Sequence, residues 1–329
     1  MQQRGLTRLG LRLLAGLTVA ACATPHVRKP IEEEPFVLSP GPPPSMKEAL
    51  LRQEKQAGGG RTPIERVGPT RRIPLVHGVI AGRPTMLLLD TGAYDHLLEG
   101  WFAHELADAE ASGKSAAVID HANRKVTMDA WSEVSLALDG WGPLEKIKPL
   151  ATRDQTMGPV TLGIGGILSP QKLARGNAVV IDFPAGEMRA EDVTQAAARV
   201  DTHRVSLGTA IRCGTAYILA ATVEGKDARL LVDTGASGTD LKGSSAPGRA
   251  LAGRSSIARD IYAVGGAVTT RVIPDAKLVV GQLSTRLDVQ LVEDRAFATR
   301  CGSDGVVGMD VLASCVVVIE PNAMRIGCD

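Results

Sequence analysis

The chain has 329 residues, of which 44% are apolar and 22% charged, a composition typical of a soluble protein with room for two domains. Lys and Arg number 37 against 36 Asp and Glu, so the chain lacks the positive charge that a nucleic-acid binder needs. We therefore expect no nucleic-acid partner. Aromatic residues make up only 3%, and the cores are expected to be aliphatic.

The N-terminal segment, residues 1–22, has the pattern of a bacterial export signal, with arginines before a short apolar stretch. That stretch, residues 13–21, is too short to cross a bilayer as a stable helix. Val-Ala-Ala-Cys, which ends at Cys22, resembles the lipobox of bacterial lipoproteins, in which the cysteine is lipidated and becomes the new N-terminus. We expect a lipid anchor at Cys22 and a periplasmic or outer-membrane location. An ordinary secretory signal is the alternative.

Residues 23–70 are rich in Pro, Gly and charge and poor in periodic apolar positions, which predicts an extended, disordered tether. From Arg71 onward, two aliphatic runs separated by a Gly-containing turn predict a β-hairpin whose second strand leads into Asp90.

The tripeptide Asp-Thr-Gly occurs twice, each time directly after an aliphatic run, in MLLLDTGA and RLLVDTGA. The hairpin-turn glycines Gly82 and Gly225 lie 143 residues apart, and so do Asp90 and Asp233. Later aliphatic landmarks repeat in the same order at an offset close to 139: Ile167-Leu168 with Val306-Val307, and residues 179–182 with residues 317–320. The repeat predicts two homologous lobes, residues 71–203 and 204–329.

Both lobes consist mainly of short Val-, Ile- and Leu-rich runs bounded by Gly, Asp and Pro, which predicts an all-β fold. Within the lobes, the helix candidates are residues 99–112, 170–174 and 309–313, and a short helix over residues 46–56 is a further candidate before them.

Apart from Cys22, the cysteines are Cys213, Cys301, Cys315 and Cys328, an even number in a chain expected to be exported. Two disulfides are therefore predicted. Three connectivities are open, and we favour Cys301 with Cys315 and Cys213 with Cys328. No cysteine or histidine cluster predicts a metal site, and no cofactor is expected.

These motifs resemble those of the aspartic peptidases of the retropepsin and pepsin type. In that family an apolar strand, an Asp-Thr-Gly loop, and a hydrophobic segment ending in Gly before a short helix form one unit, and two units share one active site. The resemblance implies two β-barrel lobes with a cleft between them. Both units lie in one chain, so a monomer should suffice for activity.

The resemblance makes Asp90 and Asp233 the catalytic pair. One ionised carboxylate would activate a water while the other, protonated, hydrogen-bonds the carbonyl of the peptide bond. Thr91 and Thr234 are expected to hydrogen-bond across to the opposite loop. Gly92 and Gly235 should permit close approach and donate their amides to the carboxylates.

The residue after each Asp-Thr-Gly is alanine, Ala93 and Ala236, as in retropepsins. An alanine cannot stabilise the ionised carboxylate by a hydroxyl hydrogen bond, so we expect an activity optimum at mildly acidic to near-neutral pH. One position departs from the family pattern: Ser169 stands where Gly308 stands in the second unit.

Residues 262–267 resemble the Gly-rich flap of retropepsins, with Tyr262, Gly265 and Gly266 as flap candidates, although an ordinary surface hairpin is equally consistent with the sequence. The first-lobe counterpart is residues 118–128. We expect an aspartic endopeptidase that acts on peptide or protein substrates in the bacterial cell envelope. The alternative is a catalytically inactive peptide-binding lipoprotein on the same fold.

Overall fold

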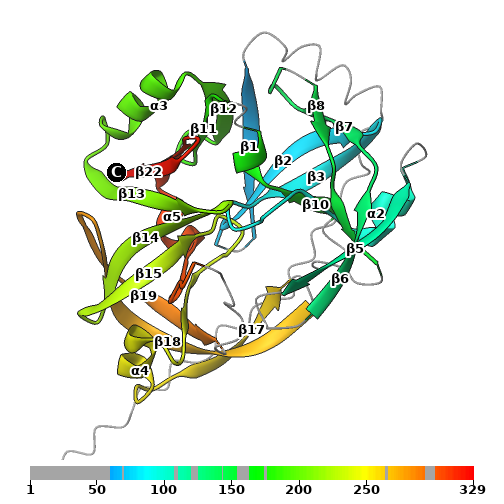
Figure 1. Cartoon of the computed structure of the whole chain (residues 1–329). Helices are drawn as coiled ribbons and strands as arrows, with labels where there is room; N and C mark the ends of the chain where they lie inside the picture. Colours follow the sequence, from blue (N-terminus) through cyan, green and yellow to red (C-terminus); the bar gives the residue numbers. More distant parts are fainter. Residues whose placement is uncertain are drawn as a thin grey trace, which may run out of the picture. The chain divides into compact units, whose positions relative to one another are not determined.

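A computed structural model describes residues 60–68, 70–106, 110–119, 125–142, 144–153, 163–173, 176–263, 266–292 and 301–329. The chain is predominantly β, as predicted (Figure 1). All the described residues belong to one compact unit. The helices among them are short: α2 (Gly100–His104), the 3-10 helix η2 (Pro170–Lys172), α3 (Val193–Val200), α4 (Ala246–Leu251) and α5 (Met309–Leu312).

The strands of the first half, residues 60–203, are β1 (Arg61–Val67), β2 (Ile73–Ile80), β3 (Arg83–Leu89), β4 (Leu97–Leu98), β5 (Ala111–Ile119), β6 (Lys125–Trp131), β7 (Val134–Leu138), β8 (Glu145–Ile147), β9 (Leu150–Thr152), β10 (Ile164–Leu168), β11 (Ala178–Asp182) and β12 (Glu187–Glu191). Those of the second half, residues 204–329, are β13 (Val205–Cys213), β14 (Ala216–Val223), β15 (Lys226–Val232), β16 (Thr239–Lys242), β17 (Ile257–Ala263), β18 (Gly266–Val280), β19 (Leu283–Val292), β20 (Gly305–Val307), β21 (Cys315–Ile319) and β22 (Ala323–Cys328).

The predicted hairpin turns are present in both halves. Ala81 and Gly82 connect β2 to β3 with positive φ values of 46° and 80°, and Glu224 and Gly225 connect β14 to β15 with 48° and 72°. Two successive residues with positive φ give the backbone twist that fits a two-residue hairpin turn. Glycine adopts the positive φ of the second position without steric cost, whereas Ala81 and Glu224 adopt a smaller positive φ at the first position.

The two halves repeat the same strand pairings. The strand before each Asp-Thr-Gly runs parallel to the later aliphatic strand, β3 with β10 and β15 with β20. The short strand after each motif pairs antiparallel with that same strand, β4 with β10 and β16 with β20, and parallel with β9 or β19 on its other side. The internal repeat seen in the sequence is therefore a repeat of strand topology.

One sheet joins the halves, with its strands in the order β1, β12, β11, β21, β22 and β13. At its centre β11 and β21 are antiparallel, and Val180 lies directly opposite Val318. These valines occupy equivalent positions in the repeat. A residue paired with its own counterpart marks a local two-fold relationship between the halves. Helix α3 packs on this sheet through Ala196 and Val200, beside Val180 and Val318.

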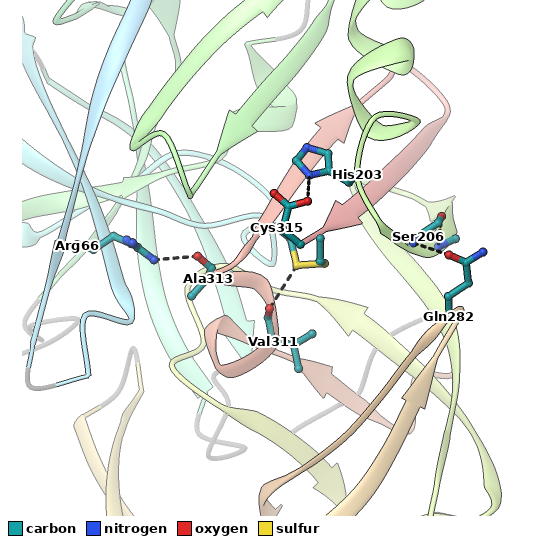
Figure 2. The surroundings of a disulfide bond; sticks show 10 residues. Arg66, His203, Ser206, Gln282, Val311, Ala313 and Cys315 are labelled. Carbon is teal, nitrogen blue, oxygen red and sulfur yellow. Dashed lines mark hydrogen bonds and ion pairs between the residues drawn. A yellow bond between two sulfur atoms is a disulfide. The ribbon is translucent and has the colours of Figure 1, made fainter.

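The predicted tether, residues 23–70, is wrong at its C-terminal end, where the chain forms a strand. Residues Arg61–Val67 form β1, which pairs with β12 and β2, and the side chains of Thr62 and Ile64 are buried. The alternation of exposed and buried positions in this short strand was obscured by flanking Gly and Pro residues. Arg66 also donates a hydrogen bond at 2.8 Å to the carbonyl oxygen of Ala313, at the end of α5 (Figure 2).

The predicted helix over residues 99–112 is correct only in its first part, because α2 ends at His104 and β5 already begins at Ala111. Ala111 pairs with Trp131 of β6, and this strand pairing overrides the helical pattern of the sequence. The short helices predicted after the two aliphatic landmarks are confirmed as η2 and α5.

Two disulfides are present as predicted, but the favoured connectivity is wrong. The bonds join Cys213 to Cys301 and Cys315 to Cys328. Cys315 and Cys328 lie directly opposite each other in the β21–β22 hairpin, so strand register brings these two side chains together. Figure 2 shows the surroundings of Cys315 beside the Val311 carbonyl of α5.

Candidate active site

The two Asp-Thr-Gly motifs begin where two buried strands end. Asp90 follows β3 and donates its amide to the Leu168 carbonyl at 3.0 Å, while Asp233 follows β15 and donates to Val307 at 3.1 Å. Both acceptors belong to the parallel neighbouring strand. The same backbone hydrogen bond thus holds each aspartate at the C-terminal end of a buried strand.

Each carboxylate is held by two amides of its own loop. The Oδ1 atom of Asp90 accepts hydrogen bonds from Gly92 N at 2.7 Å and Ala93 N at 3.0 Å. In the second copy, Asp233 Oδ1 accepts from Gly235 N at 2.8 Å and Ala236 N at 3.1 Å. The prediction that the glycine amides donate to the carboxylates is confirmed.

The two carboxylates lie against each other's glycine. A Cβ atom placed on Gly92 would come within 2.5 Å of Asp233 Cγ, and one on Gly235 within 2.5 Å of Asp90 Cγ. Real Cβ atoms do not approach other atoms so closely, so no side chain fits at either position. The two acids, 143 residues apart in sequence, are thereby brought together in one site.

The threonines form reciprocal hydrogen bonds between the two loops. Thr91 Oγ1 donates to the Val232 carbonyl at 2.8 Å, and Thr234 Oγ1 donates to the Leu89 carbonyl at 2.7 Å. Each hydroxyl also accepts the backbone N–H of the other threonine at 3.1 Å. Both side chains are fully buried, so these bonds form away from water and fix the separation of the loops.

The electrostatics of the pair favour a shared proton. Burial raises the pKa of Asp90 well above its ordinary range, and the neighbouring charge of Asp233 together with a hydrogen bond between the two side chains acts in the same direction. The amides of Gly92 and Ala93 lower this pKa but do not offset the burial. Asp90 therefore keeps its proton at a pH where an isolated carboxyl group has lost it.

The departure at Ser169 changes how the first loop is supported. Ser169 is fully buried, and its hydroxyl donates to the Ala93 carbonyl at 3.0 Å. His96 is buried beside it and accepts the Ser169 amide at Nδ1, at 3.3 Å. Burial lowers the pKa of His96 to about 4, so the ring is neutral at physiological pH. His96 is a structural residue of the loop.

Two supporting residues were missed from the sequence. Gln171 donates from Nε2 to the Ala93 carbonyl, and Asp310 accepts hydrogen bonds from the amide and hydroxyl of Thr239, both at 2.9 Å. They stand at equivalent places, three residues after Leu168 and Val307. A polar residue in the first turn after each aliphatic landmark was the signal that could have found them.

Two of the three flap candidates, Tyr262 and Gly266, lie in the hairpin of β17 and β18. Tyr262 belongs to β17 and Gly266 begins β18, and Ala263 pairs with Gly266 at the end of the hairpin. Gly265 lies outside the described residues. In the first half β5 and β6 form the corresponding hairpin, in which Met128 pairs with Ala116, and residues 120–124 lie outside the described part.

The lipidation candidate Cys22 also lies outside the described residues. Within the described ranges, no helix is long and apolar enough to cross a membrane. The same ranges hold no group of three or more His, Cys, Asp or Glu side chains that could bind a metal ion. Family models and curated proteins were both compared with the chain, and neither comparison produced a match.

Proposed function

We propose that this protein is an aspartic endopeptidase, with its two halves as the two lobes of a retropepsin- or pepsin-like fold. The observation that carries the proposal is the packing of each aspartate against the glycine of the opposite loop, Asp90 against Gly235 and Asp233 against Gly92, together with the raised pKa of Asp90. Two carboxyl groups that share one proton on rigid, reciprocally bonded loops can act as general acid and general base in one step.

In the proposed reaction, a water molecule lies between the two carboxyl groups. Asp233, ionised, takes a proton from the water as its oxygen attacks the carbonyl carbon of the peptide bond. Asp90 donates its proton to the carbonyl oxygen, which gives a neutral tetrahedral diol. Asp233 then passes its proton to the leaving nitrogen while Asp90 regains one from a diol hydroxyl, and the C–N bond breaks.

The chain's own residues supply what this reaction needs besides the acids. The amides of Gly92 and Gly235 orient the carboxylates, and the Thr91–Thr234 bonds hold the loops at a constant separation. Preorganised groups of this kind avoid reorganisation during the reaction. Both acids come from one chain, so we propose that the monomer is active.

We further propose that the enzyme acts on peptide or protein substrates in the bacterial cell envelope, anchored by lipid at Cys22. The export pattern of residues 1–22 supports this location, and the two disulfides favour an oxidising compartment. The hairpin of β17 and β18, which holds Tyr262 and Gly266, is proposed as the flap that covers the bound peptide.

The test is cleavage of a peptide library by the purified protein, with Asp90→Asn and Asp233→Asn as controls. Asparagine keeps the size of the side chain but cannot exchange the proton. A peptidase loses essentially all cleavage with either substitution. A wild-type protein that binds peptides but cleaves none would instead be the inactive envelope lipoprotein, and cleavage that survives both substitutions would exclude the proposed mechanism.

A further inference from the structure

The carbonyl oxygen that follows each Asp-Thr-Gly is bonded differently in the two halves. In the second half, the Ala236 carbonyl accepts the backbone N–H of Met309 at 2.8 Å. The equivalent residue in the first half is Pro170, which has no N–H to donate. The Ala93 carbonyl therefore cannot receive the bond that its counterpart receives.

Two side chains bind the Ala93 carbonyl in its place. Ser169 Oγ donates to it at 3.0 Å and Gln171 Nε2 at 2.6 Å. The same Nε2 lies 3.3 Å from the Thr91 carbonyl, so two oxygens face this end of the amide and identify it as the NH₂ group. These donors flank Pro170 directly in sequence.

The same comparison explains why the first half carries serine where the second carries glycine. A Cβ on Gly308 would come within 2.7 Å of the Ala236 carbonyl oxygen and 2.4 Å of the Gly238 carbonyl oxygen. The second loop thus needs glycine because its backbone packs directly against the helix start. In the first half a side chain is accommodated at this position, and its hydroxyl reaches the Ala93 oxygen.

The Ala93 peptide units connect this contact to the acid. Ala93 N donates to Asp90 Oδ1 at 3.0 Å, while Ala93 O accepts from Ser169 and Gln171. A buried carbonyl without a partner is costly, so loss of both donors would let the loop shift toward another donor or toward water. The shift would move the amide that holds Asp90.

We propose that Ser169 and Gln171 are positioning residues for Asp90, which together replace the backbone donor that Pro170 removes. They act through Ala93 and need not touch the substrate. The inference rests on the proposed peptidase function for its kinetic readout only, because the hydrogen bonds exist whether or not the site cleaves peptides. Ser169, which stands where the second half has Gly308, thus supplies one of the two donors that compensate for Pro170.

The experiment compares the double variant Ser169→Ala/Gln171→Ala with the triple variant that adds Pro170→Ala. The double variant removes both donors, and kcat should fall about tenfold to a hundredfold, as expected for a small displacement of a catalytic group, with KM changed little. The triple variant restores an N–H at residue 170, equivalent to that of Met309, and should recover a large part of kcat.

Single variants and a control complete the design. Ser169→Ala and Gln171→Ala each leave one donor to the Ala93 carbonyl, and the remaining donor should partly compensate for the lost one. Each single variant should therefore lower kcat by a factor smaller than the square root of the double variant's factor: if the double variant loses about a hundredfold, each single variant should lose less than about tenfold. Lys172→Ala, in the same short helix, removes an exposed ion pair with Asp95 and should leave kcat unchanged. If the double variant misfolds, the single variants carry the test: an effect confined to one of them, with none from the other, would overturn the shared role.

A second readout does not depend on catalysis. The titration of Asp90, followed by the pH dependence of its carboxyl ¹³C shift in NMR, should move to higher pH in the double variant, because the displaced Ala93 amide no longer lowers the pKa of Asp90, and it should return in the triple variant. A double variant with unchanged kcat and unchanged Asp90 titration would overturn the inference, as would a loss that Pro170→Ala does not reverse. If the wild type cleaves no peptide, the proposed function fails while the NMR titration still decides the role of Ser169 and Gln171.

Discussion

The backbone N–H of Thr91 and the backbone N–H of Thr234 each donate to the hydroxyl of the other threonine, both at 3.1 Å. Each hydroxyl donates its own proton to a carbonyl on the opposite strand, Val232 or Leu89. These reciprocal hydrogen bonds, here called the threonine exchange, link the ends of β3 and β15 through buried side chains. They set the distance between the two aspartates independently of any substrate.

We predict that Thr91→Val lowers both stability and activity. Valine matches threonine in size but leaves the Val232 carbonyl and the Thr234 N–H without partners in a buried site, which should reduce the free energy of unfolding by about 2–4 kcal/mol. Urea unfolding and peptide cleavage measure the two effects. Thr194→Val, at an exposed position of α3, is the matched control and should change neither. Equal stability of the two variants would contradict the buried role of Thr91.

Gly92→Ala should abolish cleavage with the fold retained. The added methyl group would lie 2.5 Å from Asp233 Cγ, so the loops must separate, and a displacement of this size should reduce kcat by about a hundredfold or more. Gly235→Ala should do the same through Asp90. Gly253→Ala serves as control, because a Cβ atom added there would have no other atom within 4 Å, and its kcat should stay at the wild-type value.

The pH profile of cleavage should peak at mildly acidic to near-neutral pH. Asp90 and Asp233 accept hydrogen bonds from backbone amides of their own loops, and Ala93 and Ala236 carry no hydroxyl that could add another donor. Ala236→Ser would add a donor beside Asp233, favour the ionised carboxylate and shift the acid limb of the profile to lower pH by about half a unit or more. A wild-type optimum below about pH 3, under the reference carboxyl range, would disprove this prediction.

Asp310 should make stability depend on pH. Burial raises the pKa of Asp310 from 3.8 to about 6, although the two hydrogen bonds from Thr239 act in the opposite direction. Arg72 lowers this pKa further and Asp240 raises it. Because the folded-state pKa is the higher one, the contribution of Asp310 to stability is present below about pH 4 and is lost as the pH rises through about 6.

Asp310→Asn imitates the protonated side chain at every pH. Between pH 4 and pH 7 the wild type should lose up to about 3 kcal/mol of unfolding free energy that the variant keeps, from 1.36 kcal/mol per pKa unit. The comparison is made by urea unfolding at both pH values, with the exposed Asp201→Asn as control. Parallel changes in the wild type and Asp310→Asn would show that Asp310 does not titrate in this range.

Local patterns explain what could be predicted. The two hairpin turns were found because Gly82 and Gly225 stand between aliphatic runs, and this turn chemistry depends on adjacent residues only. The strand repeat followed from equal spacing of Asp90 and Asp233. In contrast, β1 escaped detection because flanking Gly and Pro residues obscure its alternation, and its pairing with β12 and β2 makes it a strand.

Contacts between distant segments explain what could not be predicted. The disulfide of Cys213 with Cys301 spans 88 residues, and nothing near either cysteine specifies its partner. Gln171 was overlooked because the carbonyl to which its side chain donates, that of Ala93, lies 78 residues earlier in the sequence. Side-chain donors of this kind are recognised only when the acceptor is in place.

The sequence by itself determined the repeated strand, turn and Asp-Thr-Gly units, because the aliphatic runs and turn glycines that specify them are local. Only the tertiary structure decided that the units face each other. The pairing of Val180 with Val318, the threonine exchange and the fit of each carboxylate against the opposite glycine all require two surfaces to meet. The raised pKa of Asp90 follows from the contact between the two units, since burial and the carboxylate of Asp233 act on Asp90 only in the folded chain.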